Sequence, residues 1–552
     1  MVKNNFLPLP TNLKLIIMKR KFLVTTLALF IGFSSSIFAG GLLTNTNQNV
    51  TFLRNLARGA STEIDAAYTN PAGLAFLNGN GLFISLNNQS AFQTRTITAE
   101  FPPFAGMGGK PVKEFEGKAT AWIIPNLQAA YKFNKWVLSA NIGVVGGGGT
   151  LDFAKGLPSF EAAVSALPLM LTQAGIPTNQ YTLDSRLKGT SIIYGIQLGV
   201  TYKINPFLSA YLGGRANIVS NSYEGYIRNI QANVGGGNMV NVNTYFTAAA
   251  AQATGAANSL QPIINGGYGN FSLDDMVFVG IISQAELAQM AAGLGISETA
   301  AGALTVSQAQ GAFNQKATMA TGVANQTADK ELNCGQSGFG VAPIIGLNFN
   351  FMGLNVGVKY EFKTALELKN KMTINTTGLA DFDDGVITPY DIPALLSIGA
   401  QYNFFSKLVV SVGYHHFFDS DARMALVNDP NRPGEKIGKQ KLINGGVNEY
   451  LAGVEYRINK MFLVSCGAQI TRQGVTDDYQ SDMNFSINSY SLGFGGAISV
   501  TKKIRVNLAY FFTNYSNWTK KVTDYGKLGI AAGTDIFGRT NHTFGVGLDL
   551  RF

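Results

Sequence analysis

Apolar and polar residues alternate with a period of two along most of this chain. Between Ile192 and Ile204, every even position is Ile, Tyr, Leu or Val, whereas Gly, Gln, Thr and Lys fill the odd positions from 195 onward. The same alternation ends the chain, from Phe544 to Phe552. A period of two predicts β-strands that each have one apolar face and one small or polar face.

The alternating runs come in pairs joined by short polar breaks. The stretch "AYKFNKWVLSANIGV", residues 130–144, returns as "TYKINPFLSAYLGGR" from Thr201 and "QYNFFSKLVVSVGYH" from Gln401. Each pair predicts a β-hairpin. A soluble β-sandwich also alternates, but here the strands are ten to fifteen residues long, charges keep to the polar face, and tyrosines flank the breaks. These features favour a transmembrane barrel, because in lipid every backbone group must pair within a closed sheet.

Short and long connections also alternate along the chain. Tight breaks are expected near Asn134, Asn205, Met352, Ser406, Asn459 and Lys502. Long connections are expected near 99–116, 151–187, 228–337, 377–390, 424–445, 476–484 and 520–539. Six short and seven long connections imply fourteen strands, with short periplasmic turns and longer outer loops. The sequence therefore predicts an all-β class, a transmembrane antiparallel β-barrel of about 14 strands spanning 79–552.

The N-terminus has the pattern of an export signal. Lys19, Arg20 and Lys21 after Met18 are basic, residues 22–33 are mostly apolar, and "SSSIFAGG" contains a cleavage site after Ala39. Residues 1–39 are thus expected to be a signal peptide with an upstream extension. An exported barrel predicts the outer membrane of a Gram-negative bacterium as its location.

Residues 40–78 lack strand alternation and are too long for a simple lead-in. "NVTFLRNLARG" predicts a short helix closed by Gly59, and "STEIDAAY" predicts a helix capped by Ser61 and stopped at Asn70-Pro71. We expect this N-terminal helical hatch to plug the lumen. A disordered periplasmic tail is the alternative.

Several motifs resemble the FadL-type family of outer-membrane transporters for long-chain fatty acids and other hydrophobic compounds. They are "DAAYTNPAGLAFL", "WIIPNLQAAYKFNKWVLSANIGVVGGGG", "YDIPALLSIGAQYNFFSKLVVSVGY", "GVNEYLAGVEYRINKMFLVSCGAQ" and the terminal "HTFGVGLDLRF". Together they span nearly the whole mature chain. The resemblance implies a hatch that ends at Asn70, Pro71 and Ala72, capture of ligand at the outer loops, and sideways release where the third strand is kinked. The connection 228–337 is unusually long and departs from the pattern.

Residue chemistry suggests where such a ligand would be held. A run of glycines at the outer half of the third strand predicts weak or bent pairing and a lateral gate, although lumen glycines also simply make room. This run is Gly146, Gly147, Gly148 and Gly149. Apolar residues at helical spacing in the loop 151–187 are candidate ligand contacts, or pack the loop itself. They are Phe160, Val164, Leu167, Met170 and Leu171.

Cations on the lumen face or the plug could meet a carboxylate, or pair with Glu361, Glu455 or Asp549. The candidates are Arg54, Arg58, Arg215, Lys359, Arg457 and Arg505. Residues 284–324 also have helical spacing, with a solvated loop as the alternative.

Composition narrows the function classes. Charged residues make up only 14% of the 552, and no run of about 20 apolar residues predicts a spanning helix. The net charge of +9 falls to +4 without residues 1–39, which gives no nucleic-acid signal. With three histidines and two cysteines distant in sequence, we expect no metal site, no cofactor and no enzymatic activity. Cys334 and Cys466 could form one disulfide or remain two separate thiols.

The expected partners are a hydrophobic small molecule or fatty acid and outer-membrane lipid, and the expected state is a monomer. A general porin for polar solutes and a surface adhesin or structural barrel remain the alternative functions.

Overall fold

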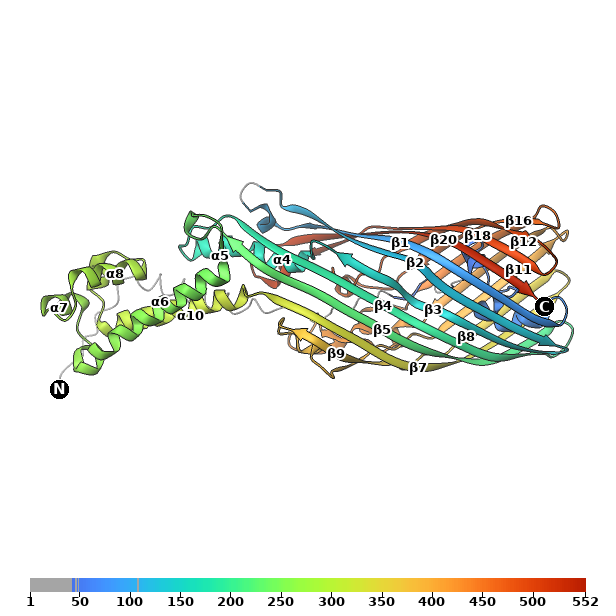
Figure 1. Cartoon of the computed structure of the whole chain (residues 1–552), viewed down its shortest axis with the longest axis horizontal. Helices are drawn as coiled ribbons and strands as arrows, with labels where there is room; N and C mark the ends of the chain where they lie inside the picture. The colour runs from blue at the N-terminus through green and yellow to red at the C-terminus, as the bar shows by residue number, and fades with distance from the viewer. Residues whose placement is uncertain (1–41, 45–46, 48, 107–108) are drawn as a thin grey trace.

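The computed structural model describes residues 42–44, 47, 49–106 and 109–552, and it is dominated by one closed antiparallel β-barrel (Figure 1). The first strand pairs with the last, Phe83 opposite Arg551 and Glu100 opposite Thr534, which closes the sheet. Eighteen strand segments belong to this sheet. One of them is only two residues long, and three continue a preceding strand past a break, so the described residues form fourteen barrel strands as the sequence predicts.

The barrel strands follow one another around the sheet in chain order. They are β1 (Gly81–Glu100), β2 (Val112–Phe133), β3 (Trp136–Phe153), β4 (Tyr181–Lys203), β5 (Leu208–Ala232), β7 (Lys330–Phe351), β8 (Leu354–Glu361) continued by β9 (Glu367–Asn375), β10 (Ile387–Pro389) continued by β11 (Leu395–Phe404), β12 (Leu408–Phe417), β15 (Asn448–Arg457), β16 (Phe462–Arg472), β17 (Ser489–Ser499), β18 (Ile504–Tyr515) continued by β19 (Trp518–Val522), and β20 (Gly533–Arg551). The two-residue β6 (Val240–Asn241) extends β5, and β13 (Leu426–Asn428) pairs with β14 (Lys436–Gly438) in an outer loop.

The tight turns lie where the breaks in the pattern predict them. Asn134, Met352 and Ser406 adopt positive φ angles of 54°, 47° and 58°, the left-handed conformation that reverses a chain within two residues. All of these turns lie at the end of the barrel that also holds the C-terminus (Figure 1). We call this the turn side and the opposite end the loop side.

The alternating pattern places the apolar face outside. Along β4, Tyr194, Ile196 and Leu198 are exposed, whereas Gln197 and Thr201 are buried in the lumen. Tyrosines and other aromatic side chains gather on the outer wall next to the turns, for example Trp136 and Tyr202, whose tilted rings have centroids 4.5 Å apart. An apolar wall with an aromatic rim is what a lipid-facing barrel requires.

The loop side carries the helices. Loop helices α4 (Pro158–Ser165) and α5 (Leu167–Gln173) cover the barrel mouth, and a long antiparallel pair, α6 (Val242–Ile263) and α10 (Val306–Gln326), projects far beyond it (Figure 1). Helices α7 (Leu273–Phe278), α8 (Gln284–Leu294) and α9 (Glu298–Gly302) form the tip of this stalk around their own apolar core. The prediction of helix within 284–324 is confirmed, and these helices belong to the long outer connection with many exposed positions. None of the helices in the described ranges is long and apolar enough to cross a membrane.

Candidate functional site

The N-terminal segment lies inside the turn-side half of the barrel. It forms α2 (Val50–Arg54), α3 (Ala66–Thr69) and the 3₁₀ helix η2 (Pro71–Phe76). Asn49 caps α2 by accepting a hydrogen bond from the Thr51 N–H at 2.7 Å. Both α-helices are shorter than the sequence predicts: the first ends at Arg54 instead of Gly59, and the second begins at Ala66. Residues 58–65 form a tight turn instead.

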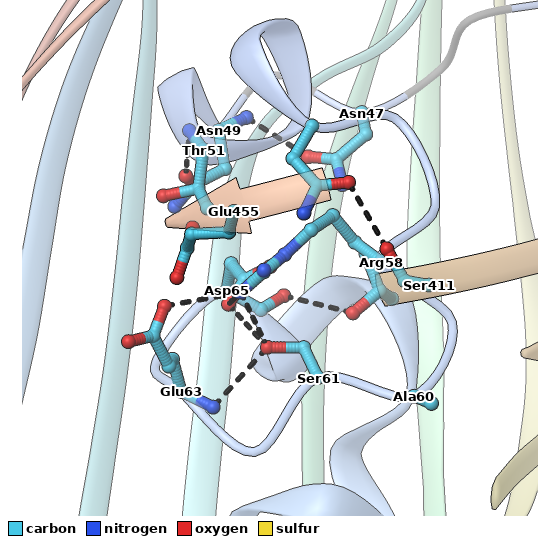
Figure 2. A network of polar contacts seen from close by, with 12 residues as sticks. Asn47, Asn49, Thr51, Arg58, Ala60, Ser61, Glu63, Asp65, Ser411 and Glu455 are labelled. Carbon is cyan, nitrogen blue, oxygen red and sulfur yellow. Dashed lines mark hydrogen bonds and ion pairs between the residues drawn. The ribbon is translucent and has the colours of Figure 1, made fainter. Parts of the chain in front are cut away.

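An ion pair explains that turn. The Arg58 guanidinium donates to both carboxylate oxygens of Asp65, at 2.6 and 2.9 Å, and the Ser61 hydroxyl donates to the same carboxylate at 2.6 Å (Figure 2). This bidentate, buried contact closes the chain on itself, which a continuous helix would prevent. Burial alone raises the pKa of Glu63, but Arg505 and Arg58 outweigh it and hold that pKa well below its ordinary value.

Barrel side chains hold the segment in place through its backbone carbonyls. Gln197 donates to Ala67 O at 2.9 Å, Thr201 to Pro71 O at 2.7 Å and Ser209 to Ala72 O at 2.7 Å. Asn355 and Lys132 make similar bonds from other strands, to Ala60 O at 2.5 Å and Leu77 O at 2.6 Å. Because the donors come from strands around the lumen, the segment is fixed on several sides.

Two ion pairs add to this attachment. The Arg54 guanidinium lies 2.6 Å from Glu455 on β15, and both side chains are almost completely buried. The Arg505 guanidinium on β18 lies 2.7 Å from Glu63. We call residues 49–77 the plug, since they occupy the lumen and contact its walls throughout.

Lumen glycines make room for the plug. A Cβ at Gly453 would lie 1.7 Å from Asn55 Oδ1, and one at Gly399 would lie 2.5 Å from the Gly59 carbonyl carbon. Both distances are far below van der Waals contact, and the one at Gly399 is to plug backbone, so the plug would have to move. The small residues on the polar face of the strands therefore leave space for the plug. In the sequence, this space is marked by glycines at alternate strand positions.

Above the plug, toward the loop side, the lumen contains two neighbouring cavities. The smaller contains about 340 Å³ of empty space, part of it open to solvent, between Tyr68 of the plug and Val145 and Ile193 of the wall. The larger contains about 590 Å³ of empty space and is also partly open to solvent. Leu43, Ile193, Ile392 and Pro393 line both, so we treat the two as one lumen cavity. Its walls are mostly apolar. The larger part is lined by Leu42, Leu43, Ile193, Tyr390, Asp391, Ile392, Pro393, Asp419, Met424, Ala425, Lys439, Tyr479 and Asn484.

Lys439 is the cation of this cavity. Its side chain is 4% exposed, and its Nζ lies 4.2 Å from the centroid of the Tyr479 ring. Within the described part of the chain it has no ion-pair partner. Burial, with the nearby charge of Lys520, lowers the pKa of Lys439 to about 7.

Asp419 is a second titratable group in the same lining. One of its carboxylate oxygens accepts the Val447 N–H at 2.9 Å, while Oδ1 has no hydrogen-bond partner among the described residues. Burial raises the pKa of Asp419 to about 7. The third, Asp391, is paired with Arg423 at 3.0 Å. Burial thus brings the titration of one cation and one acid in this lining close to neutral pH.

The cations that the sequence offered as carboxylate ligands have other partners. Arg54 pairs with Glu455, Arg505 with Glu63, and Arg58 with Asp65. Arg215 and Lys359 share Glu361, at 2.6 and 3.5 Å, and both lie over the ring of Tyr68 in the floor of the cavity. Arg457 is exposed at the turn side instead of facing the lumen. Lys439 was not among the candidates, because no strand parity marks a residue in an outer loop.

The apolar residues of the loop 151–187 do not form an exposed groove. Phe160, Val164, Leu167, Met170 and Leu171 are all less than 7% exposed. Other outer loops cover them, including Phe104 and Tyr525 in the same core. These residues do lie on helices, as their spacing predicts, but the apolar face of the helices packs against other outer loops above the barrel.

The glycine run lies where the wall beside the cavity is irregular. Between the pairs Ala119–Leu151 and Asn126–Gly143, no residue of β2 pairs with β3. The register of β3 against β4 also shifts, between Val144 and Gly146 and between Gly147 and Gly149. Gly147 has a φ of 74°, and a Cβ there would lie 2.0 Å from Ser191 O. Gly146 faces Leu43 and Ile193 of the cavity lining.

The hatch end, Asn70, Pro71 and Ala72, is buried against β7 and neighbouring strands.

Cys334 and Cys466 are both free thiols, one buried on β7 and one exposed on β16. The alternative of a disulfide between them is therefore wrong.

Comparison with known proteins supports the fold. No family model and no curated protein matches the sequence. Among solved structures, a Pseudomonas aeruginosa FadL homologue is 12% identical, with a TM-score of 0.57 over 93% of this chain and 100% of that chain. The Ralstonia pickettii toluene transporter TbuX (13% identity, TM-score 0.48, 92% and 100% covered) and the Pseudomonas putida toluene transporter TodX (14%, 0.46, 93% and 100%) are less similar. The likeness to the first of these shows that this chain has the FadL-type barrel fold.

Proposed function

We propose that this chain transports hydrophobic compounds, such as long-chain fatty acids, across the outer membrane of a Gram-negative bacterium as a monomer. The observation that carries the proposal is the apolar lumen cavity, which is closed by the plug on the turn side and reaches the irregular edge of β3. A polar solute would need a continuous aqueous path, which the attached plug obstructs. An apolar molecule needs only an apolar cavity and a way into lipid.

The exit is sideways through the wall. Val145 lines the cavity, and from Val144 to Thr150 β3 has no paired residue on β2. Unpaired strand edges are the weakest part of a barrel wall, since no ladder hydrogen bonds must break for them to separate. A molecule leaving here would pass the exposed Trp122 and Ile123 on β2 and enter the hydrocarbon layer.

Lys439 gives the cavity a preference for amphiphiles with a carboxylate. A buried ammonium without a carboxylate partner has lost most of its hydration. An anionic head group would replace that hydration with a charge-assisted hydrogen bond. The apolar lining holds the chain of the same molecule. Neutral hydrocarbons would use the lining alone and bind without help from Lys439.

Uptake and conductance together test this function. Cells that produce the protein should accumulate labelled oleate faster than cells without it, while the purified protein in planar bilayers should show no large steady conductance. A large steady channel with no oleate uptake would instead identify a general porin. Binding of a matrix protein without either activity would identify an adhesin.

A further inference from the structure

Three neighbouring turns on the turn side present a row of basic side chains. The backbone joins them: Arg457 N donates to Lys407 O, and Ser499 N donates to Met461 O, each at 2.8 Å. The turns between β11 and β12, β15 and β16, and β17 and β18 therefore lie side by side. Their cations, which we call the basic arc, are Lys407, Arg457, Lys460, Lys502 and Lys503.

The charge of the basic arc is not compensated by the protein. All five side chains are exposed, and over the described ranges none of them takes part in an ion pair. Residues 404–408, 457–462 and 499–504 contain no Asp or Glu. Glu455 precedes Arg457 by two residues and Asp549 lies opposite Arg505 in the sheet, but both point into the lumen, where they bind Arg54 and the side chains of Ser85 and Asn507. Five uncompensated cations require anions from outside.

Exposed apolar side chains accompany these cations. Phe405 is 91% exposed at the tip of its turn, and Val500 is 57% exposed. Ile458, Met461 and Phe462 are also exposed on this stretch of the outer wall. The wall is thus apolar up to the level of the basic arc and cationic at its end. An apolar wall that ends in cations matches the boundary between the acyl chains and the head groups of a lipid leaflet.

We propose that the basic arc binds the anionic head groups of phospholipids in the leaflet on the turn side. The proposal rests on the membrane location inferred above. An anionic leaflet fits better than an acidic protein, because the cations follow the circumference of the barrel and continue an apolar wall. Each cation near an anionic surface strengthens the attraction about fivefold. Salt should weaken this attraction, because the arc is exposed.

The test is lipid retention by the full-length protein. The protein in detergent micelles is mixed with equal amounts of phosphatidylglycerol and phosphatidylethanolamine, and the bound lipids are counted by native mass spectrometry. The wild type should retain several-fold more phosphatidylglycerol. The variant K407Q/R457Q/K460Q/K502Q/K503Q should lose this preference, and so should the wild type at high salt.

A matched variant controls for the change in charge. K110Q/K155Q/K369Q/K371Q/K436Q removes five exposed cations that lie on the loop side and have no ion-pair partner in the described structure. It should keep the preference for phosphatidylglycerol. Heat-modifiable migration on gels confirms that each variant keeps its barrel.

Equal retention of the two lipids by the wild type would overturn the proposal and leave an acidic periplasmic protein as the partner of the basic arc. The same preference in both five-site variants would overturn it as well. Failure of transport is distinguishable from these results: a protein that inserts and selects phosphatidylglycerol but moves no oleate contradicts only the proposed function. A protein that stays soluble without detergent contradicts both.

Discussion

The Arg54 guanidinium lies 2.6 Å from the Glu455 carboxylate, although 400 residues separate the two in the chain. One belongs to the plug and the other to β15, so this contact joins the N-terminal segment to the barrel wall. Arg54 is completely buried. The pair is therefore a point at which the attachment of the plug can be measured.

Removing the charge of Glu455 should loosen the plug. In Glu455→Gln, Arg54 stays buried without its anion, which costs about 3 kcal/mol in comparable buried pairs. Amide hydrogen exchange across residues 50–77 should accelerate roughly a hundredfold. The control is Glu435→Gln, which breaks the exposed pair with Arg432 at 2.9 Å and should cost below about 1 kcal/mol. Equal exchange in wild type and Glu455→Gln would show that the pair does not hold the plug.

A bulky residue at Gly453 should expel the plug. A leucine there cannot coexist with the present position of the fully buried Asn55 side chain, because even its Cβ would lie 1.7 Å from Asn55 Oδ1. Gly453→Leu should therefore open a steady ion conductance in planar bilayers that the wild type lacks. Gly335→Leu on β7 is the control, since the nearest atoms to its Cβ are 3.8 Å away. A closed Gly453→Leu barrel would mean that the plug is not the element that blocks the lumen.

Carboxylate binding should depend on pH through two groups of the cavity. As the pH falls through about 7, Lys439 gains a proton and Asp419 becomes neutral, so the cavity gains positive charge and attracts an ionised fatty acid. Above pH 7, Lys439 loses its proton and Asp419 becomes anionic, so the same ligand is repelled. Oleate affinity, measured by calorimetry on detergent-solubilised protein, should fall by at least about tenfold from pH 6 to pH 8.

Substitution of Lys439 separates its charge from the apolar lining. Lys439→Met should weaken oleate binding about tenfold at pH 6 and leave hexadecane binding unchanged, because only the carboxylate uses the ammonium. Lys436→Met, three residues earlier and exposed, should change neither. Equal losses for oleate and hexadecane would assign Lys439 a role in packing.

Regularising β3 should block the exit. Gly147→Val places a Cβ 2.0 Å from Ser191 O at a φ of 74°, so the strand must abandon its present irregular path. Uptake of labelled oleate should fall about tenfold or more, which corresponds to 1.4 kcal/mol or more on the barrier. The barrel should remain heat-modifiable on gels, and Gly335→Val should transport normally. Undiminished uptake in Gly147→Val would place the exit elsewhere.

The strands could be predicted because the alternation of apolar and polar residues that defines each strand lies within the strand itself. Alternation between Ile192 and Ile204 requires one face in lipid and one in the lumen, and β4 ends at Lys203, one residue before the end of this alternation. The same parity placed Arg215 and Lys359 on the lumen face correctly. It could not give their partner, since Glu361 reaches Arg215 only after the barrel has closed.

Other features could not be predicted from the sequence because they depend on contacts between residues far apart in the chain. Arg58 and Asp65 read as parts of two helices, yet their ion pair replaces helix with a turn. Phe160 belongs to a true helix whose apolar face is covered by other loops. The stalk helix α6 begins at Val242 in an Ala- and Asn-rich stretch with little apolar periodicity, and it gains stability from α10 some sixty residues later.

Photo-crosslinking of a diazirine-labelled fatty acid tests the path most directly. After illumination of the wild type in lipid nanodiscs, peptide mapping locates the adducts. The account predicts adducts in the cavity lining, at Ile392, Met424 and Tyr479, and at the β2 edge, on Trp122 and Ile123. Adducts along the turn-side end of the plug, at Leu74 and Leu77, would contradict it, because the ligand would then cross the lumen lengthwise.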